Sequence, residues 1–318
     1  MAQSIHDLAE GIDPLIDPVD AREKSFHAST YYRGAAFFLI GNQSGSRLVS
    51  LWTQQIANFD KAIALLKPAP GESFTAEATN ASIGPYDIPG YFFKAEKHCR
   101  KKLPKLVVIG GYGSSQQESY RTLCAGVLRR GMNYVTYEGP GQPTPRRSQG
   151  IGFIADWWTA TSSVVDFLFK RANVDTTKID LMGESFGGPL APRATSQDPR
   201  IAAVVGRDGA CISTVRLDLA IPPALNALYD RRVKKEFDQV VETLATNASL
   251  PTSVRCIFQQ GLYAFNTTSP LEWSKRLGVT VLAPAIVAGL GSCPVCVAKG
   301  EASAIMIPCV IRQRWPSP

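Results

Sequence analysis

The chain has 318 residues, of which 45% are hydrophobic and 19% are charged. This length and composition allow one large α/β domain, or a domain with an appended helical region. The net charge of +7 is modest, and the basic residues occur in short, scattered runs, which argues against a nucleic-acid-binding face.

Hydropathy and cysteine usage indicate where the protein is found. No stretch reaches the roughly 18 apolar residues that cross a bilayer, and the polar N-terminus lacks the apolar segment of a secretory signal. The seven cysteines are an odd number at irregular spacing, which favours free thiols in a reducing compartment. Cys293 and Cys296 form a lone C-x-x-C pair without a second ligand pair, so we expect no metal site. We therefore expect a cytoplasmic protein that does not bind membranes.

Residues 1–70 form a predicted N-terminal helical region. Aromatic residues recur over 21–40, and apolar residues at nearly helical spacing run over 48–66. Pro68 and Pro70 then end the helical pattern. These helices either pack only against one another or cover a substrate pocket.

Residues 71–303 are predicted to form an α/β core. The pattern over 72–94 indicates antiparallel strands. Beyond it, apolar strands alternate with helices, which is typical of a parallel sheet covered on both faces. We expect strands at 103–110, 132–137, 179–182, 201–206 and 293–298, helices at 118–130, 154–171 and 186–196, and a helical cap at about 211–277.

The stretch from Lys178 to Pro189, KIDLMGESFGGP, predicts a strand, a G-x-S-x-G turn and a helix. In this nucleophile elbow the serine lies on a tight turn that exposes its hydroxyl. Its glycine neighbours are needed because a Cβ there would collide with the strand or the helix. Ser185 is therefore the candidate nucleophile, and the backbone N–H of Phe186, at the helix start, is a candidate donor to an oxyanion.

Loops after the other parallel strands supply further candidates, because ligands bind at the carboxyl ends of such strands. Gly111 and Tyr112 follow the strand at 103–110, and their glycine-rich loop lets the backbone approach a substrate oxygen as a second oxyanion donor. Glu138 follows the next strand and either shapes the pocket or anchors its loop. Asp208 follows the strand at 201–206 and either acts as the catalytic acid or holds a loop.

Stretches along most of the chain carry a family resemblance: 31–33 with 37–38, 86–92, 110–118, 131–142, 183–194, 269–273 and 293–302. They resemble the fungal α/β-hydrolases of polyketide and other secondary-metabolite clusters, including pigment-precursor-shortening, fusarin-type and cytochalasan-type hydrolases. They are also similar to the bacterial pseudooxynicotine hydrolases.

The resemblance implies a doubly wound, mostly parallel sheet with an N-terminal helical region and a helical cap. It also implies a Ser–acid–His triad, no organic cofactor and no metal. The substrate would be a hydrophobic, polyketide-like small molecule. We expect no nucleic-acid or membrane partner, and a homodimer is compatible with the sequence.

The histidines depart from the family pattern. The triad order of this fold is serine, acid, histidine, yet His6, His27 and His98 all precede Ser185. His98 is expected near the amino end of a parallel strand, the wrong edge for catalysis. His27, in the helical region, could approach the pocket from above. Without a base, a serine hydroxyl is a poor nucleophile.

The C-terminal stretch also departs from the family. Glu301 lies in a matching stretch and is, with Asp208, a candidate acid, but Ser303 stands about where the family has its aspartate. Residues 304–318 match nothing in the family and form a predicted irregular tail, which we interpret as out-of-frame or intron-derived. The sequence thus predicts that the last strand and helix of the fold are missing, and that the sheet ends on an unprotected edge.

The sequence favours a hydrolase acting on a carbonyl of a polyketide-derived ester, thioester, lactone or β-diketone. One alternative is a catalytically impaired or truncated member that binds a hydrophobic metabolite or a partner. Another is acyl transfer or cyclisation at the same serine. The first and third use one site, so the sequence does not separate them.

Overall fold

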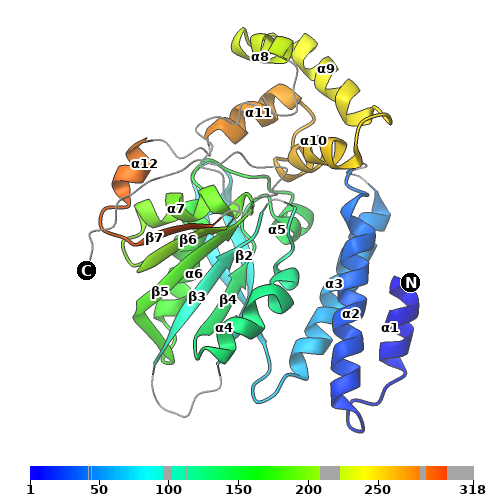
Figure 1. Cartoon of the computed structure of the whole chain (residues 1–318), viewed down its shortest axis with the longest axis vertical. Coiled ribbons are helices and arrows are strands. Elements are labelled where there is room, and N and C mark those ends of the chain that lie inside the picture. The colour runs from blue at the N-terminus through cyan, green and yellow to red at the C-terminus, as the bar shows by residue number, and fades with distance from the viewer. Residues whose placement is uncertain are drawn as a thin grey trace.

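A mostly parallel sheet forms the centre of the computed structural model, which describes residues 1–41, 43, 45–95, 102–111, 113–207, 223–279 and 284–298 (Figure 1). The sheet order in this part of the chain is β1-β2-β4-β3-β5-β6-β7. The strands are β1 (Glu72–Asn80), β2 (Gly84–Phe93), β3 (Leu103–Ile109), β4 (Asn133–Tyr137), β5 (Val174–Glu184), β6 (Ala203–Arg207) and β7 (Val295–Ala298).

The helices fall into an N-terminal group, a group between the strands and a cap group. The first group is α1 (Ala2–Glu10), α2 (Pro18–Phe37) and α3 (Ser46–Ala64). The second is the 3-10 segment η1 (Gln116–Glu118), the π segment η2 (Tyr120–Cys124), α4 (Ala125–Arg129), α5 (Pro143–Ser148), α6 (Trp158–Phe169) and α7 (Gly187–Gln197). The third is α8 (Pro223–Asp230), α9 (Lys234–Thr246), α10 (Thr252–Ala264), α11 (Pro270–Val279) and α12 (Pro284–Gly289).

The pairing of the strands confirms the predicted sheet. β1 pairs antiparallel with β2, and β2 pairs antiparallel with β4. The neighbouring pairs from β4 through β3, β5 and β6 to β7 are all parallel. Every residue of β4 is buried, as expected for a strand covered on both faces, whereas β1 alternates between exposed and buried residues.

The N-terminal helices pack on one face of the sheet. The rings of Phe26 in α2 and Phe59 in α3 lie 5.7 Å apart, and Phe59 lies 5.0 Å from Tyr91 of β2. These rings belong to one buried cluster with side chains of β2, β3 and β4. α6 and α7 pack against the sheet in a second, larger cluster. The N-terminal helices therefore share an apolar core with the sheet.

Three helices differ from the sequence prediction. The helix expected over 118–130 is divided into η1, η2 and the short α4. The other two differ for identifiable reasons. The helix expected from residue 154 begins at Trp158, because the backbone of Phe153 bonds to the cap instead: its N–H donates to Ala264 and its carbonyl accepts from Arg276. α5 was not predicted because it contains two prolines. Both lie in its first turn, where a missing N–H leaves no intrahelical bond unmade.

The sheet ends at β7 within the described residues. β7 pairs with β6 in parallel, and three of its four residues are exposed. The predicted absence of a further strand and helix concerns residues 299–318, which lie outside the described residues. No helix in the described part of the chain is long and apolar enough to cross a membrane.

Candidate active site

Ser185 lies on the sharp turn between β5 and α7, with a positive φ of 52°. A non-glycine residue in this left-handed region is strained, and such strain clusters at functional sites. A Cβ on Gly183 would lie 1.9 Å from the Gly187 carbonyl oxygen, and one on Gly187 would lie 2.4 Å from that of Ile109. The two glycines therefore let the turn close, as the sequence predicted.

The Ser185 side chain is exposed, and no described residue forms a hydrogen bond with its hydroxyl. His6 instead bonds through Nδ1 to Asn58 Oδ1 at 2.9 Å, between α1 and α3. His27 is exposed on α2 and does not hydrogen-bond Ser185. His98 lies outside the described residues. The described part of the chain thus holds no histidine in contact with the candidate nucleophile.

The candidate acids Asp208 and Glu301, like Ser303 and residues 304–318, lie outside the described residues. The charged pair that the structure does place beside the elbow joins Glu184 to Arg207, at 2.6 Å. The N–H of Ser185 donates to the Arg207 carbonyl at 3.0 Å. The end of β6 is thus tied to the elbow through one ion pair and one backbone hydrogen bond.

The loop after β3 lies against Ser185. A Cβ on Gly111 would lie 3.0 Å from the Cβ of Ser185, 3.1 Å from its Oγ and 3.2 Å from the backbone nitrogen of Phe186. Gly111 is thus the point where the glycine-rich loop, the serine and the start of α7 meet. The Gly111 N–H donates to Ser114 Oγ at 3.2 Å, which braces the loop. Tyr112 lies outside the described residues.

Gln142 holds this loop from the other side. Its buried Nε2 donates to the carbonyl of Gly110 at 2.8 Å and more weakly to that of Gly111 at 3.4 Å. Its Oε1 accepts the N–H of Gly139 at 2.9 Å. One side chain therefore joins the loops that follow β3 and β4, at the edge of the sheet where Ser185 lies.

Glu138, at the end of β4, is buried and anchors two segments. It accepts the N–H of Gln116 at 2.9 Å and that of Thr144 at 2.6 Å. Burial raises the pKa of this carboxyl, although its hydrogen bonds, chiefly with Thr144, act in the opposite direction. Of the two roles left open by the sequence, these contacts favour the loop anchor.

Aromatic side chains from the core and the cap surround Phe186. Its ring meets Phe153 edge-on at 5.0 Å and Phe265 at 6.0 Å between centroids. Arg276 of α11 donates to the carbonyls of both Phe153 and Phe265, each at 2.5 Å. The residue after the candidate nucleophile is therefore fixed in an apolar cluster that also anchors the cap.

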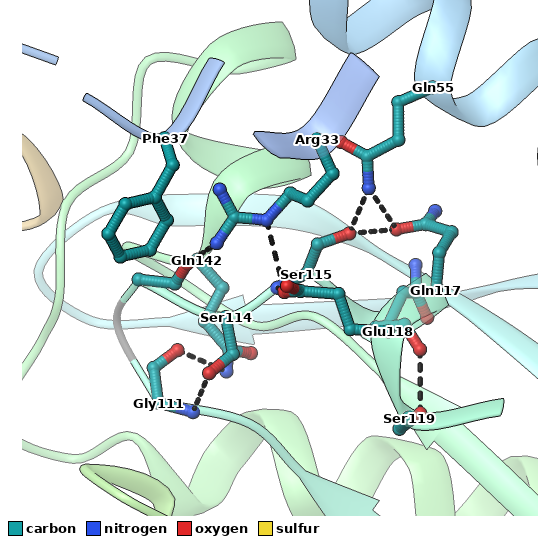
Figure 2. A network of polar contacts seen from close by, with 12 residues as sticks. Arg33, Phe37, Gln55, Gly111, Ser114, Ser115, Gln117, Glu118, Ser119 and Gln142 are labelled. Atoms are coloured by element: carbon teal, nitrogen blue, oxygen red, sulfur yellow. Dashed lines mark hydrogen bonds and ion pairs between the residues drawn. The ribbon is translucent and has the colours of Figure 1, made fainter. Parts of the chain in front are cut away.

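Side chains of the N-terminal helices also reach the loop after β3 (Figure 2). Arg33 of α2 donates from Nε to Glu118 at 3.0 Å and from a terminal nitrogen to the Gly113 carbonyl. Gln55 of α3 donates to Ser115 Oγ at 2.5 Å. Side chains of α2 and α3 thus contact the segment that follows Gly111.

Sequence reasoning assigned no role to Arg33, Gln55 or Gln142. Arg33 and Gln142 stand in stretches that carry the family resemblance, 31–33 and 131–142, and this was the signal that could have found them. Nothing in the sequence places Gln55 near residue 115. Among the described residues, no group of three or more His, Cys, Asp or Glu is placed to bind a metal.

Known proteins with similar sequences are fungal hydrolases, as the resemblance predicted. The chain is 30% identical over 278 residues to hydrolase acrC of Aspergillus aculeatus, a match that covers 80% of this chain and 62% of acrC. It is 31% identical to the 20-hydroxy-prefusarin hydrolase of Gibberella moniliformis, over 65% of this chain and 50% of that protein. The chain therefore spans about half to three fifths of the length of these relatives. No protein-family model matches it.

Among solved structures, the chain is similar to the 2,6-dihydroxy-pseudo-oxynicotine hydrolase. The TM-score is 0.70 at 21% identity, and the match covers 93% of this chain and 70% of the other. At this identity the likeness concerns the fold. The two chains share the fold over the N-terminal helices as well as over the sheet.

Proposed function

We propose that this chain, which has the α/β-hydrolase fold and resembles the fungal hydrolases described above, is a serine hydrolase with Ser185 as its nucleophile. The observation that carries the proposal is the positive φ of Ser185 after β5, because a strained turn of this kind projects the serine hydroxyl, and the Ser185 side chain is exposed. Gly111 also contacts Ser185 and the start of α7, so the backbone of its loop lies beside the place where an oxyanion would form.

The proposed chemistry is acyl transfer to water through the serine. Ser185 Oγ attacks the substrate carbonyl carbon, and negative charge develops on the carbonyl oxygen. Backbone N–H groups of Phe186 and of the Gly111–Tyr112 loop would stabilise that charge, helped by the positive end of the α7 dipole. A general base must take the hydroxyl proton and pass it to the leaving group, which departs as an acyl-serine forms; water then cleaves the acyl-serine to give the acid and restore the hydroxyl. The described residues place no histidine in a hydrogen bond with Ser185.

The proposed substrate is a hydrophobic, polyketide-derived molecule attacked at an ester, thioester, lactone or β-diketone carbonyl. The buried rings of Phe153 and Phe265 that pack around Phe186 support an apolar substrate, since they make one side of the elbow apolar. The name of one relative points the same way, since that protein acts on 20-hydroxy-prefusarin. Acyl transfer or cyclisation would use the same serine with an internal nucleophile in place of water.

A second candidate function is binding without turnover. The observation that favours it is the exposed Ser185 side chain, whose hydroxyl forms no hydrogen bond with a described residue. Removal of one triad member costs several orders of magnitude in rate but leaves binding and oxyanion stabilisation in place. A chain of this kind would retain affinity for a hydrophobic metabolite and hydrolyse it slowly.

Hydrolysis of p-nitrophenyl esters of increasing acyl length separates the two functions. A serine hydrolase turns over the longer esters, and Ser185→Ala abolishes that turnover. The matched control is Ser148→Ala, which removes a serine hydroxyl bonded only to the Thr144 carbonyl of α5 among the described residues. Saturable ester binding without release of nitrophenol would favour the binding function. Turnover that survives in Ser185→Ala would contradict the proposed nucleophile.

A further inference from the structure

The glycine-rich loop after β3 is held by side chains of the N-terminal helices. Arg33 projects from α2, with its guanidinium 4.8 Å above the ring of Phe37, one turn further along the helix. From this position it donates to the Gly113 carbonyl and to Glu118 Oε2 (Figure 2). Glu118 Oε2 in turn accepts the N–H of Ser115 at 2.7 Å. Arg33 therefore contacts the loop directly, and also indirectly through the Glu118 carboxylate that accepts the Ser115 N–H.

One glutamine is hydrogen-bonded to the same loop, and a second lies beside it. Gln55 of α3 donates to Ser115 Oγ and, at 3.3 Å, to Gln117 Oε1. Gln260 of α10 donates to the Phe37 carbonyl at 3.2 Å, and its Oε1 would lie 3.4 Å from a Cβ on Gly113. Helices from the N-terminal region and from the cap thus meet at Gly113, two residues from the contact between Gly111 and Ser185.

The loop needs such external contacts to keep one conformation. Gly110, Gly111 and Gly113 carry no side chain that could pack, and glycine has the widest choice of backbone conformations. An oxyanion donor is useful only if its N–H is already aimed at the oxygen when charge develops. Hydrogen bonds to backbone carbonyls of the loop, from Gln142 on one side and Arg33 on the other, fix that direction.

Stability alone explains the Arg33 contacts poorly. Arg33 is buried, so removing its charge from water is costly, whereas the Glu118 side chain is 46% exposed. An ion pair with a carboxylate this exposed adds little to the free energy of folding. The contact with the Gly113 carbonyl has a geometric consequence instead, because it sets the orientation of the peptide between the oxyanion loop and η1.

We propose that Arg33 is a positioning residue of the active site, which aligns the oxyanion loop through the Gly113 carbonyl. The inference rests on the proposed function, since it assigns Arg33 a part in the reaction at Ser185. It makes the N-terminal helical region a structural member of the oxyanion site. Removing the guanidinium should slow reaction at Ser185 more than it lowers stability.

The test compares Arg33→Lys with Arg33→Met. Lysine can still pair with Glu118, but it lacks the two separate donor nitrogens, fixed in one plane, with which the guanidinium reaches Glu118 and the Gly113 carbonyl. Two quantities are measured for each variant: the urea unfolding midpoint, and the second-order rate constant for labelling of Ser185 by a fluorophosphonate. The fluorophosphonate reports on the oxyanion loop because its phosphoryl oxygen occupies the same place as the substrate oxygen.

The expected result is a separation of rate from stability. Both variants should label about tenfold more slowly than the wild-type chain, less than the roughly hundredfold loss that follows removal of a direct oxyanion donor. Arg33→Lys should nevertheless unfold close to the wild-type midpoint. Labelling of Arg33→Lys at the wild-type rate, or a rate that follows the unfolding midpoint across both variants, would overturn the proposal.

Arg171→Met is the matched control. Arg171 pairs with Glu72 through two hydrogen bonds of 2.7 Å and lies 4.3 Å from the centroid of the Phe92 ring. Arg171 precedes the start of β5 at Val174, whereas Ser185 follows the end of β5 at Glu184, so the control pair lies away from the elbow. This variant loses the packing of the guanidinium over the rings of Phe92 and Phe167, so it should lower the unfolding midpoint and leave the labelling rate unchanged.

A further measurement keeps the inference separate from the proposed function. If the folded wild-type chain does not label at all, the proposed nucleophile fails. The alignment claim is then decided by hydrogen exchange of the peptide that covers the loop after β3. Exchange that is faster in Arg33→Lys than in the wild type, by about tenfold or about 1.4 kcal/mol, and unchanged in Arg171→Met supports the claim. Equal exchange in the Arg33→Lys and wild-type chains overturns it.

Discussion

The centre of the sheet and its β7 edge differ in how closely their atoms are packed. Around β3 and β5 the backbone leaves no spare room, so that a single added Cβ on Gly183 would meet a carbonyl oxygen at 1.9 Å. At the other extreme, Val297 of β7 is 44% exposed, and β7 pairs with β6 on one side within the described residues. The centre carries the nucleophile and the oxyanion loop, whereas the triad acid of this fold would follow β7.

This difference shows how the candidate site is divided. The nucleophile half depends on steric constraints within a few residues of Ser185, and packing from α2, α3, α7 and the cap reinforces it. The acid and base of the family pattern would come from beyond β6 and β7, where Asp208 and Glu301 lie outside the described residues. Damage at the centre should therefore cost much more stability than damage at the β7 edge.

The largest effect is expected for Gly183→Ala. The new Cβ would overlap the Gly187 carbonyl, so either β5 or α7 must move, at a cost of more than about 4 kcal/mol in the free energy of unfolding. Urea denaturation followed by circular dichroism measures it. Gly34→Ala is the control, because a Cβ there meets nothing within 4 Å and the exposed helix interior favours alanine by up to about 1 kcal/mol. A Gly183→Ala chain with wild-type stability would contradict the claim that the turn at Ser185 has no room for a Cβ on residue 183.

A smaller loss is expected for Gln142→Met. Methionine fills similar volume but leaves the half-buried Gly110 carbonyl and the buried Gly139 N–H without their partner, which should cost about 3 kcal/mol. Gln149→Met is the matched control: Gln149 also makes two backbone hydrogen bonds, both to Asp87, but at the surface. Gln149→Met should lower the free energy of unfolding by less than about 1 kcal/mol. Equal losses in equilibrium unfolding would mean that burial of the Gln142 contacts does not matter.

Glu138→Gln should have an effect that depends on pH. The glutamine NH2 must face one of the two backbone N–H groups that Glu138 now accepts, which costs about 2 kcal/mol. Burial raises the pKa of Glu138 above its ordinary value of 4.5. The folded state then holds the proton more tightly than the unfolded state, so the wild type loses stability as pH rises from 4.5 through the raised pKa.

The difference in unfolding free energy between the wild type and Glu138→Gln should therefore be largest near pH 4.5 and shrink toward neutral pH, since glutamine does not titrate. Urea titrations at several pH values measure this difference. A difference that grows with pH would have the wrong sign for a buried carboxylate of raised pKa, and a constant one would show that Glu138 has the same pKa in both states.

The smallest effects compare two valines in neighbouring strands. Val204 of β6 is buried and packs in the main apolar cluster, so Val204→Ala should cost about 1.5 kcal/mol. Val297→Ala, on the exposed β7 edge, should change the free energy of unfolding by less than about 0.5 kcal/mol. Thermal unfolding of the two variants side by side measures the contrast. A larger loss at Val297 would mean that β7 is covered in the folded protein.

Much of this arrangement could be predicted from the sequence. The elbow, the parallel core and the antiparallel strands at 72–94 follow from local patterns, because glycine spacing and continuous apolar runs act within a few residues. The predicted α/β-hydrolase fold is confirmed by the sheet and by the likeness to a solved hydrolase. The contacts of Arg33 with Gly113 and of Gln55 with Ser115 join residues 80 and 60 positions apart, and no local pattern encodes them.

The direct test of the proposed function is mass spectrometry of the folded chain after reaction with a fluorophosphonate. Serine chemistry at the elbow predicts one phosphonyl adduct, on the peptide that contains Ser185, and its absence in Ser185→Ala. An unlabelled wild-type chain, or equal labelling of Ser185→Ala at another residue, would contradict the assignment of Ser185 as a nucleophile.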